Sequence, residues 1–199
     1  MTMMKIVTRL SALLFASLLL ATSAQSAPAL KAGVFDPPRA APEFAAVSSS
    51  KGGELKLGSY RGKVVLLLFG FTQCPEVCPT TLATLAQARK LLGAQAAGVQ
   101  VIYLTVDPER DDIGRIKEYL AAFDASFVGG TGKLPALAAV YKNYGVSASK
   151  VPMPSGGYAM NHSTSIYLID RAGLLRAMMP YGHDAPDFVH DLQALLAEK

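Results

Sequence analysis

The chain has 199 residues, of which 51% are hydrophobic, and this length suits one globular domain with a short additional segment. Nineteen Lys and Arg residues against fifteen Asp and Glu residues give a formal net charge of +4. Because the basic residues form no stripe with interleaved aromatic residues, we expect no nucleic-acid partner.

Residues 1–26 predict a secretory signal peptide. Lys5 and Arg9 give this segment a basic start, and the apolar run 10–21 follows. The run is short for a bilayer span of about 20 residues, so cleavage is favoured over retention as a membrane anchor. Export predicts a periplasmic or membrane-facing location in the cell envelope. Cysteines in such an oxidising compartment stay reduced only if a thiol reductant acts on them.

The rest of the chain alternates strands with helices. Residues 27–50 are rich in Pro, Ala and Ser and predict an extended linker, which leaves the domain over 51–199. Apolar and alternating runs predict strands over 54–57, 63–71, 99–107, 163–169 and 174–180. Amphipathic runs predict helices over 80–92, 113–123, 134–144 and 187–198, and a long loop is expected over 147–161. This order predicts an α/β, thioredoxin-like fold, with a central mixed sheet flanked by helices and a short N-terminal hairpin.

The only two cysteines, Cys74 and Cys78, lie between the most apolar predicted strand and the first predicted helix. Residues four apart share a helix face, so both sulfurs are expected at one spot above the strand end, where the helix dipole favours thiolate. Such a pair can form a structural disulfide, exchange disulfides or bind a soft metal. A disulfide across so short a loop stabilises little, and the spacing departs from the usual C-x-x-C of redox proteins.

A third metal ligand must come from the three histidines. His190 is expected on a solvated helix face, and His183 in a loop or cap. His162 immediately precedes the strand 163–169, which in a thioredoxin-like sheet lies beside the central strand, so its ring is expected to face the cysteines. Two thiolates and one imidazole suit copper, above all Cu(I), and with an added ligand also Cu(II). No proline stands before this strand, whereas thiol-active thioredoxin folds carry a cis-proline there.

Other residues near the expected site have ordinary structural roles as alternatives to a role in the site. Asp107 ends the second buried strand, at the sheet edge where α/β proteins bind ligands, but it could simply cap the turn through Pro108. Met153 and Met160 flank the histidine loop, and gap filling is the usual role of such side chains. We interpret three basic residues as solvated surface rather than as a partner-facing rim: Arg110, Lys142 and Lys150.

Three ordered motifs resemble the SCO family, called SenC in some bacteria. They are Gly-Phe-Thr-Gln-Cys-Pro-Glu-Val-Cys-Pro over 70–79, Thr-Val-Asp-Pro-Glu-Arg-Asp over 105–111, and His-Ser over 162–163 ahead of a Tyr-Leu-Ile-Asp strand. The resemblance implies that Cys74, Cys78 and His162 are copper ligands. It also implies that Asp107 lies beside these ligands or contacts a partner.

The same resemblance implies that the chain delivers copper to the dinuclear copper centre of cytochrome c oxidase, or reduces the cysteines of that centre. The implied partners are the copper-centre subunit of the oxidase, a copper donor protein and a thiol reductant. We therefore expect a metallochaperone rather than an enzyme. The main alternative is a thiol–disulfide oxidoreductase of the cell envelope without an obligatory metal. A peroxide-reducing enzyme is a weaker alternative, since related folds use an activated cysteine after a similar strand.

Overall fold

The computed structural model describes residues 29–154 and 156–198, so the expected signal peptide over 1–26 lies outside the described residues. The strands are β1 Gly33–Ala40, β2 Val47–Ser49, β3 Val64–Gly70, β4 Val99–Thr105, β5 Val128–Gly132, β6 Ala148–Pro152, β7 Tyr158–His162, β8 Ile166–Ile169 and β9 Leu174–Met179. The α-helices are α1 Val77–Leu92, α2 Ile113–Ala121, α3 Leu134–Tyr144 and α4 Ala185–Ala197. Two short 3-10 helices are η1 Leu57–Tyr60 and η2 Gly93–Gly98.

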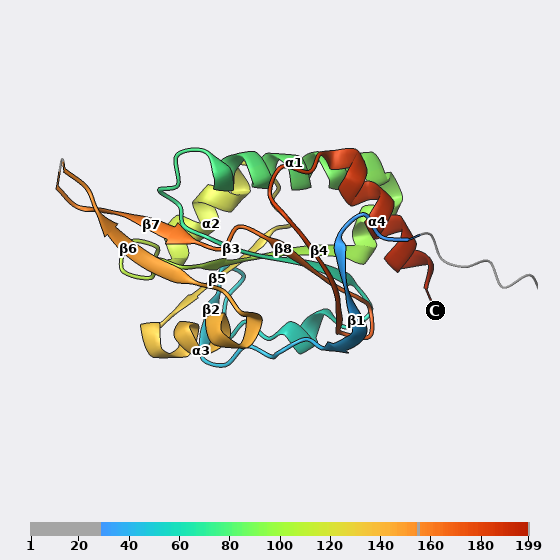
Figure 1. Cartoon of the computed structure of the whole chain (residues 1–199), viewed down its shortest axis with the longest axis horizontal. Helices are drawn as coiled ribbons and strands as arrows, with labels where there is room; N and C mark the ends of the chain where they lie inside the picture. The colour runs from blue at the N-terminus through green and yellow to red at the C-terminus, as the bar shows by residue number, and fades with distance from the viewer. Residues whose placement is uncertain (1–28, 155, 199) are drawn as a thin grey trace, which may run out of the picture.

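A mixed sheet with the strand order β1-β9-β8-β3-β4-β5-β2 forms the middle layer of the molecule. Helices α1, α2 and α4 pack on one face of this sheet, and α3 packs on the other (Figure 1). The strands that β3 touches are β4, which runs parallel to it, and β8, which runs antiparallel. The predicted central mixed sheet between helices is therefore confirmed.

The central strand β3 is buried along its whole length, which explains its continuous run of apolar residues. Successive side chains point to opposite faces, so Leu66 packs towards α1 and Leu67 packs towards α3. Because β3 and β4 are parallel, their carboxyl ends lie at the same edge of the sheet. The cysteine turn after β3 and the Asp107 turn after β4 are thus neighbours.

The N-terminal part of the domain differs from the expected linker over 27–50. Strand β1 pairs antiparallel with β9, and β2 pairs antiparallel with β5, so both lie at edges of the main sheet. Phe44, which lies between these two strands in the sequence, is buried, and so is Val47, the first residue of β2. Prolines are tolerated in edge strands, and their number concealed this pairing in the sequence. A strand over 54–57 is not formed: Glu54 makes a single bridge with Ser48, which closes a short N-terminal hairpin.

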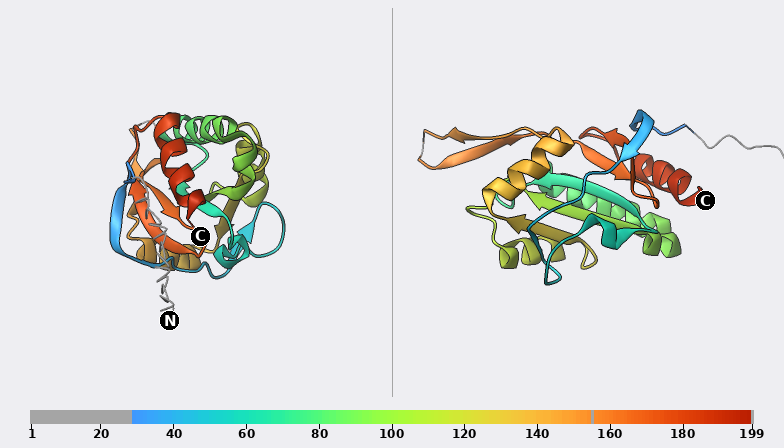
Figure 2. Two further views of the ribbon diagram at one scale, coloured as in Figure 1. Left: turned by 90° about the vertical axis from the view of Figure 1, so that its right-hand side faces the viewer. Right: turned by 90° about the horizontal axis from the view of Figure 1, so that it is seen from below.

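Residues 147–161 do not form the expected loop. They build the hairpin β6–β7, which extends away from the body of the molecule (Figure 2). Its turn contains Gly156 and Gly157 at φ values of 88° and 76°, a backbone region that favours glycine. His162 is the last residue of β7, and the strand expected from residue 163 begins only at Ile166. The two prolines of this segment misled the sequence interpretation, because they hide the alternation of a hairpin strand.

Within the described part of the chain, the helices are all too short or too polar to cross a lipid bilayer.

Candidate metal centre

The turn between β3 and α1 holds the two cysteines together. The backbone N–H of Cys74 donates to the carbonyl of Phe71 at 3.1 Å, and the backbone N–H of Cys78 donates to the sulfur of Cys74 at 3.4 Å. The Cys74 sulfur therefore caps the first turn of α1. Both cysteines are free thiols, Cys78 buried and Cys74 half-buried. The spacing of four residues thus brings the pair to one place, next to the end of β3.

Gly70 makes room for the Cys78 sulfur. A Cβ atom at this position would lie 2.8 Å from the Cys78 sulfur and 2.9 Å from the hydroxyl of Tyr103, closer than real contacts allow. The resulting burial raises the pKa of the Cys78 thiol to about 12, although a hydrogen bond from the Phe71 backbone lowers it in part. The helix dipole was expected to favour the thiolate form. At Cys78, burial outweighs that effect.

His162 presents one ring nitrogen for binding. Its Nδ1 lies 2.7 Å from the carbonyl oxygen of Ser163, and since a carbonyl only accepts, Nδ1 carries the hydrogen. The lone pair of the neutral ring is therefore on Nε2. Burial lowers the pKa of His162, while the hydrogen bond to Ser163 raises it. This is the arrangement in which metal-binding histidines are commonly held.

Phe71 contacts both His162 and the cysteine turn. Its ring meets the His162 ring edge to face, with 5.8 Å between the ring centroids and 87° between the ring planes. The backbone of Phe71 binds Cys74, so the two parts of the site share this residue. Across residues 29–154 and 156–198, no three His, Cys, Asp or Glu side chains form a ready-made metal cluster. The structure thus unites the two cysteines, and it places the His162 ring against Phe71 without forming a three-residue cluster in the described part of the chain.

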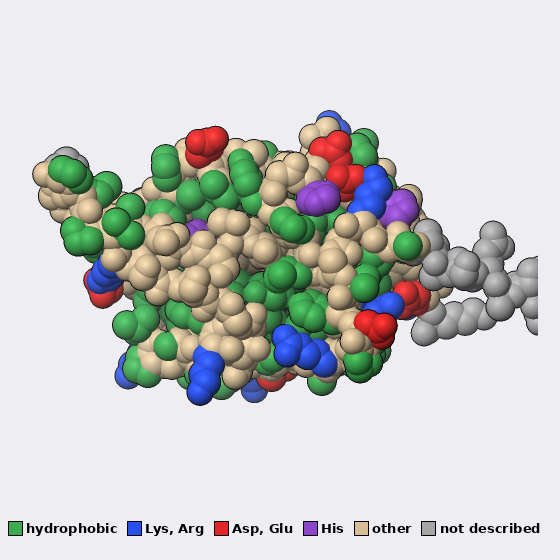
Figure 3. Space-filling model, in the orientation of Figure 1, with side chains coloured by type: hydrophobic (Ala, Val, Ile, Leu, Met, Phe, Trp, Pro, Cys, Tyr) green, Lys and Arg blue, Asp and Glu red, His purple; other side chains and the backbone are tan. Residues whose placement is uncertain are grey.

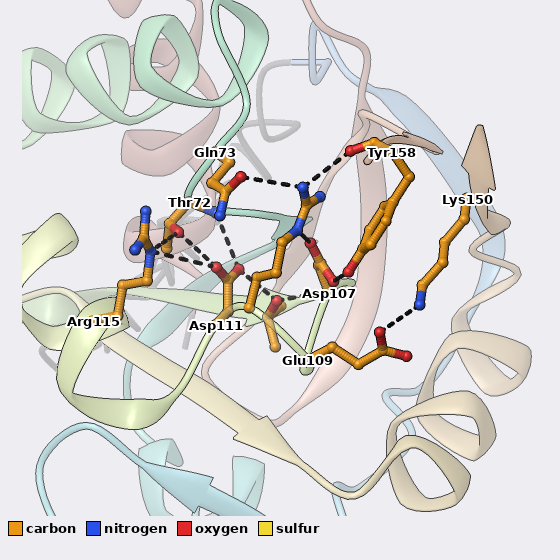
Figure 4. A network of polar contacts seen from close by, with 10 residues as sticks. Thr72, Gln73, Asp107, Glu109, Asp111, Arg115, Lys150 and Tyr158 are labelled. Atoms are coloured by element: carbon orange, nitrogen blue, oxygen red, sulfur yellow. Dashed lines mark hydrogen bonds and ion pairs between the residues drawn. The ribbon is translucent and has the colours of Figure 1, made fainter. Parts of the chain in front are cut away.

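Asp107 contacts the hairpin of His162 and not the cysteines. Its side chain is 1% exposed, and it accepts hydrogen bonds from Arg110 Nε and, at 2.8 Å, from the hydroxyl of Tyr158 on β7 (Figure 4). Its backbone N–H donates to Thr105 Oγ1 at 2.9 Å. Asp107 therefore does more than cap the turn through Pro108. Arg110, which we interpreted as solvated surface, is part of this polar network.

Asp111 is a residue of the site that the sequence interpretation missed. Its side chain is fully buried and accepts hydrogen bonds from the backbone and hydroxyl of Thr72, at 3.0 Å and 2.5 Å. It also accepts from Thr105 Oγ1 at 2.7 Å. Asp111 thereby fastens the cysteine turn to the end of β4 (Figure 4). The signal in the sequence was a second acidic residue four positions after Asp107, within the motif over 105–111.

The remaining candidate residues have other partners. His183 and His190 bind Asp187 and Asp191 of α4, each at 2.9 Å. Met153 is exposed on the hairpin, where hydrophobic side chains gather (Figure 3). Met160 packs against the core on the α3 side of the sheet. Lys150 forms an exposed ion pair with Glu109.

Solved structures with the same architecture include ScoI from Bradyrhizobium japonicum, determined with copper bound. It is 34% identical to this chain, with a TM-score of 0.72, and the match covers 79% of this chain and 99% of that one. Apo Sco1 from Thermus thermophilus is 33% identical, with a TM-score of 0.75, and the match covers 84% of this chain and 98% of that one. These similarities confirm the predicted α/β, thioredoxin-like fold.

Sequence comparisons agree with the structural ones. The mitochondrial SCO2 homolog of Mus musculus is 35% identical over 141 residues, which cover 69% of this chain and 55% of that protein. This chain thus spans about half the length of that curated relative. The family profile described as SCO1/SenC matches residues 36–197. Since that match covers most of the chain, the protein belongs to the SCO1/SenC family.

Proposed function

We propose that this chain is an exported copper metallochaperone. It takes up copper through Cys74, Cys78 and His162 and passes it to the copper-centre subunit of cytochrome c oxidase. The observation that carries the proposal is the pair of adjacent free cysteines at the start of α1, with His162 against Phe71 of the same turn and its lone pair on Nε2. The copper bound to the Bradyrhizobium japonicum relative supports the same assignment.

The donor set suits a soft ion. Thiolates select Cu(I), and a neutral imidazole adds a third donor of moderate softness. Since Cys78 is a thiol when the metal is absent, copper binding must release its proton. The Phe71 ring or the end of β7 must shift for His162 to reach the ion that the cysteines hold. Copper is cargo in this proposal, so the site must release it as well as bind it.

Anaerobic copper titration of the reduced, purified chain tests the ligand set. We expect one Cu(I) per chain, and loss of tight binding in both Cys74→Ser and Cys78→Ser. His162→Ala should lower the copper affinity by about ten-fold or more, the order seen when residues supporting a metal site are lost. His183→Ala is the matched control and should bind as the wild type does. If His162→Ala kept the copper affinity and the Cu(II) spectrum of the wild type, His162 would not be a copper ligand.

Transfer is a separate measurement. The copper-loaded chain is mixed with the copper-free soluble domain of the oxidase subunit, and the metal on each protein is followed by native mass spectrometry. Movement of copper to the subunit is expected. Retention on this chain, with the subunit competent to take copper from another source, would refute the delivery step.

A second candidate function is thiol–disulfide exchange, in which the chain reduces the disulfide of the oxidase copper centre. Its support is the arrangement of the thiols, with Cys74 the more exposed and Cys78 directly behind it. Cys74 thiolate would attack one sulfur of the partner disulfide, and Cys78 would then attack Cys74 and release the reduced partner. Two electrons and two protons pass to the partner, and this chain ends as a disulfide. Rescue of oxidase activity by a His162→Ala chain would favour this exchange over copper delivery.

A further inference from the structure

We infer that Arg110 is a positioning residue, whose guanidinium clasps the cysteine turn to the hairpin that carries His162. The inference rests on the proposed function in one respect, because it concerns the placement of the proposed ligands. The clasp itself can be measured without copper. It joins two segments that are far apart in the sequence and that also meet where the Phe71 ring contacts His162.

The hydrogen bonds of Arg110 reach both segments. Its Nη1 donates to Gln73 Oε1 at 3.1 Å, and Gln73 directly precedes Cys74. The same Nη1 donates to the carbonyl of Tyr158 at 3.0 Å, and Tyr158 starts β7, the strand that ends at His162. Gln73 and Tyr158, which accept these two hydrogen bonds, are both labelled in Figure 4. One side chain therefore binds the residue that precedes Cys74 and the first residue of the strand that ends at His162.

Aromatic contacts strengthen the same connection. The guanidinium carbon of Arg110 lies 3.9 Å from the centroid of the Tyr158 ring and 5.9 Å from that of Phe71. Both distances are within the range of cation–π attraction. Phe71 in turn touches the His162 ring. Arg110 therefore contacts both Phe71, which touches the His162 ring, and Tyr158 at the start of the strand that ends at His162.

Asp107 fixes the orientation of this guanidinium. The buried carboxylate accepts from Arg110 Nε on one oxygen and from the Tyr158 hydroxyl on the other. A flat fork with several donors can satisfy acceptors in different directions, which the single ammonium group of a lysine does not reproduce. The carboxylate thus anchors both the arginine and the hairpin.

A purely local ion pair between Asp107 and Arg110 is the alternative explanation. Such a pair would bond within its own turn, yet two of the three hydrogen-bond acceptors of Arg110 belong to other segments. The burial of its Nη2, which has no partner among the described residues, also departs from an ordinary surface arginine. By contrast, Lys150 and Glu109 form an exposed pair at the same hairpin, and exposed pairs contribute little.

Hydrogen–deuterium exchange of the metal-free, reduced chain tests the clasp. In Arg110→Gln we expect backbone amides of the hairpin 147–162 to exchange about ten-fold faster, the order expected when hydrogen bonds to a charged group are lost. The matched control is Arg115→Gln, which removes an arginine that bonds Thr72 of the cysteine turn but not the hairpin. This control should change hairpin exchange by no more than about two-fold.

Equal hairpin exchange in Arg110→Gln and in the wild type would overturn the inference, as would an equal effect of Arg115→Gln. Should Arg110→Gln fail to fold, Arg110→Lys keeps the charge and loses the fork, and it should still speed hairpin exchange. Copper affinity is the second measurement: Arg110→Lys should lower it by about ten-fold with one copper still bound per chain. Because the exchange experiment uses no metal, its result tests the role of Arg110 even if the chain does not bind copper.

Discussion

The imidazole of His162 meets the ring of Phe71 edge to face, with 5.8 Å between their centroids, and Phe71 also opens the turn that holds the cysteines. Phe71 is 5% exposed and belongs to the core on the α3 side of the sheet. One buried aromatic residue therefore contacts the proposed histidine ligand and contributes to its burial. The environment of His162 depends on this ring.

Replacing Phe71 with leucine should raise the pKa of His162 towards its ordinary value of 6.5, because burial is the main cause that lowers it. A lowered pKa in the folded state stabilises the fold above pH 6.5, and this contribution is lost as the pH falls through the folded-state pKa. Phe71→Leu should therefore lose less stability than the wild type on mild acidification. Proton NMR titration of the imidazole in the metal-free chain measures the shift. Phe35→Leu, in edge strand β1, is the control, and a shift of the same size there would contradict the prediction.

The two thiols should differ in reactivity. Burial raises the pKa of Cys78 to about 12, so its nucleophilic thiolate is scarce at pH 8, whereas Cys74 is half-buried. Iodoacetamide should therefore modify the Cys78→Ser chain, which keeps Cys74, at least about ten-fold faster than the Cys74→Ser chain. Mass spectrometry of timed samples gives both rates. Equal rates would show that the Cys78 sulfur is accessible in solution.

Removing the charge of Asp111 should loosen the cysteine turn. In Asp111→Asn an amide nitrogen replaces one carboxylate oxygen. It then faces either the Thr72 hydroxyl, which now donates to Oδ1, or the Thr72 backbone N–H and the Thr105 hydroxyl, which now donate to Oδ2. Leaving buried donors unpaired costs about 1–3 kcal/mol each, so the free energy of unfolding should fall by about that amount. Urea unfolding measures the change.

The neighbouring residue offers a matched control for this substitution. Asp112 caps α2 by accepting from the backbone of Arg115 at 2.8 Å, and asparagine caps a helix about as well as aspartate. Asp112→Asn should therefore change stability by less than about 0.5 kcal/mol. If Asp112→Asn lowered the free energy of unfolding more than Asp111→Asn does, the buried carboxylate of Asp111 would not be the one that stabilises the cysteine turn.

The central part of the site could be predicted from the sequence because it is local. The apolar run 64–70 predicts a buried strand, and the cysteine spacing places Cys74 and Cys78 on one turn at its end. The helices predicted over 113–123 and 134–144 follow from their apolar periodicity, and they are observed over 113–121 and 134–144. These signals lie within a few residues of the feature they predict.

The rest of the site depends on contacts between distant segments, which local patterns do not contain. Prolines concealed β1 and the β6–β7 hairpin, so His162 was expected after a loop rather than at the end of a strand. No pattern predicts that Arg110 reaches from the β4 turn to Gln73 and Tyr158. The contact of the Phe71 ring with His162 was likewise hidden, since it follows from side-chain packing rather than from sequence spacing.

Gly70 should tolerate no side chain, because the space beside it is already filled. In Gly70→Ala the new Cβ would meet the Cys78 sulfur at 2.8 Å and the Tyr103 ring at 2.9 Å, in a strand buried along its whole length. Overpacking of this kind typically costs about 1–3 kcal/mol, and the displaced sulfur should lower copper affinity as well. Urea unfolding and copper titration measure the two effects.

The control for Gly70→Ala is Gly33→Ala in edge strand β1, where a Cβ would meet only the carbonyl of Met178 at an ordinary 3.6 Å. This control should change stability by less than about 0.5 kcal/mol and leave copper affinity as it is. The two glycines thus separate the effect of an added methyl group in a strand from the effect of displacing the Cys78 sulfur. If Gly70→Ala had the same stability and the same copper affinity as Gly33→Ala, Cys78 would have room to move. The tight fit around its sulfur would then not be needed for the site.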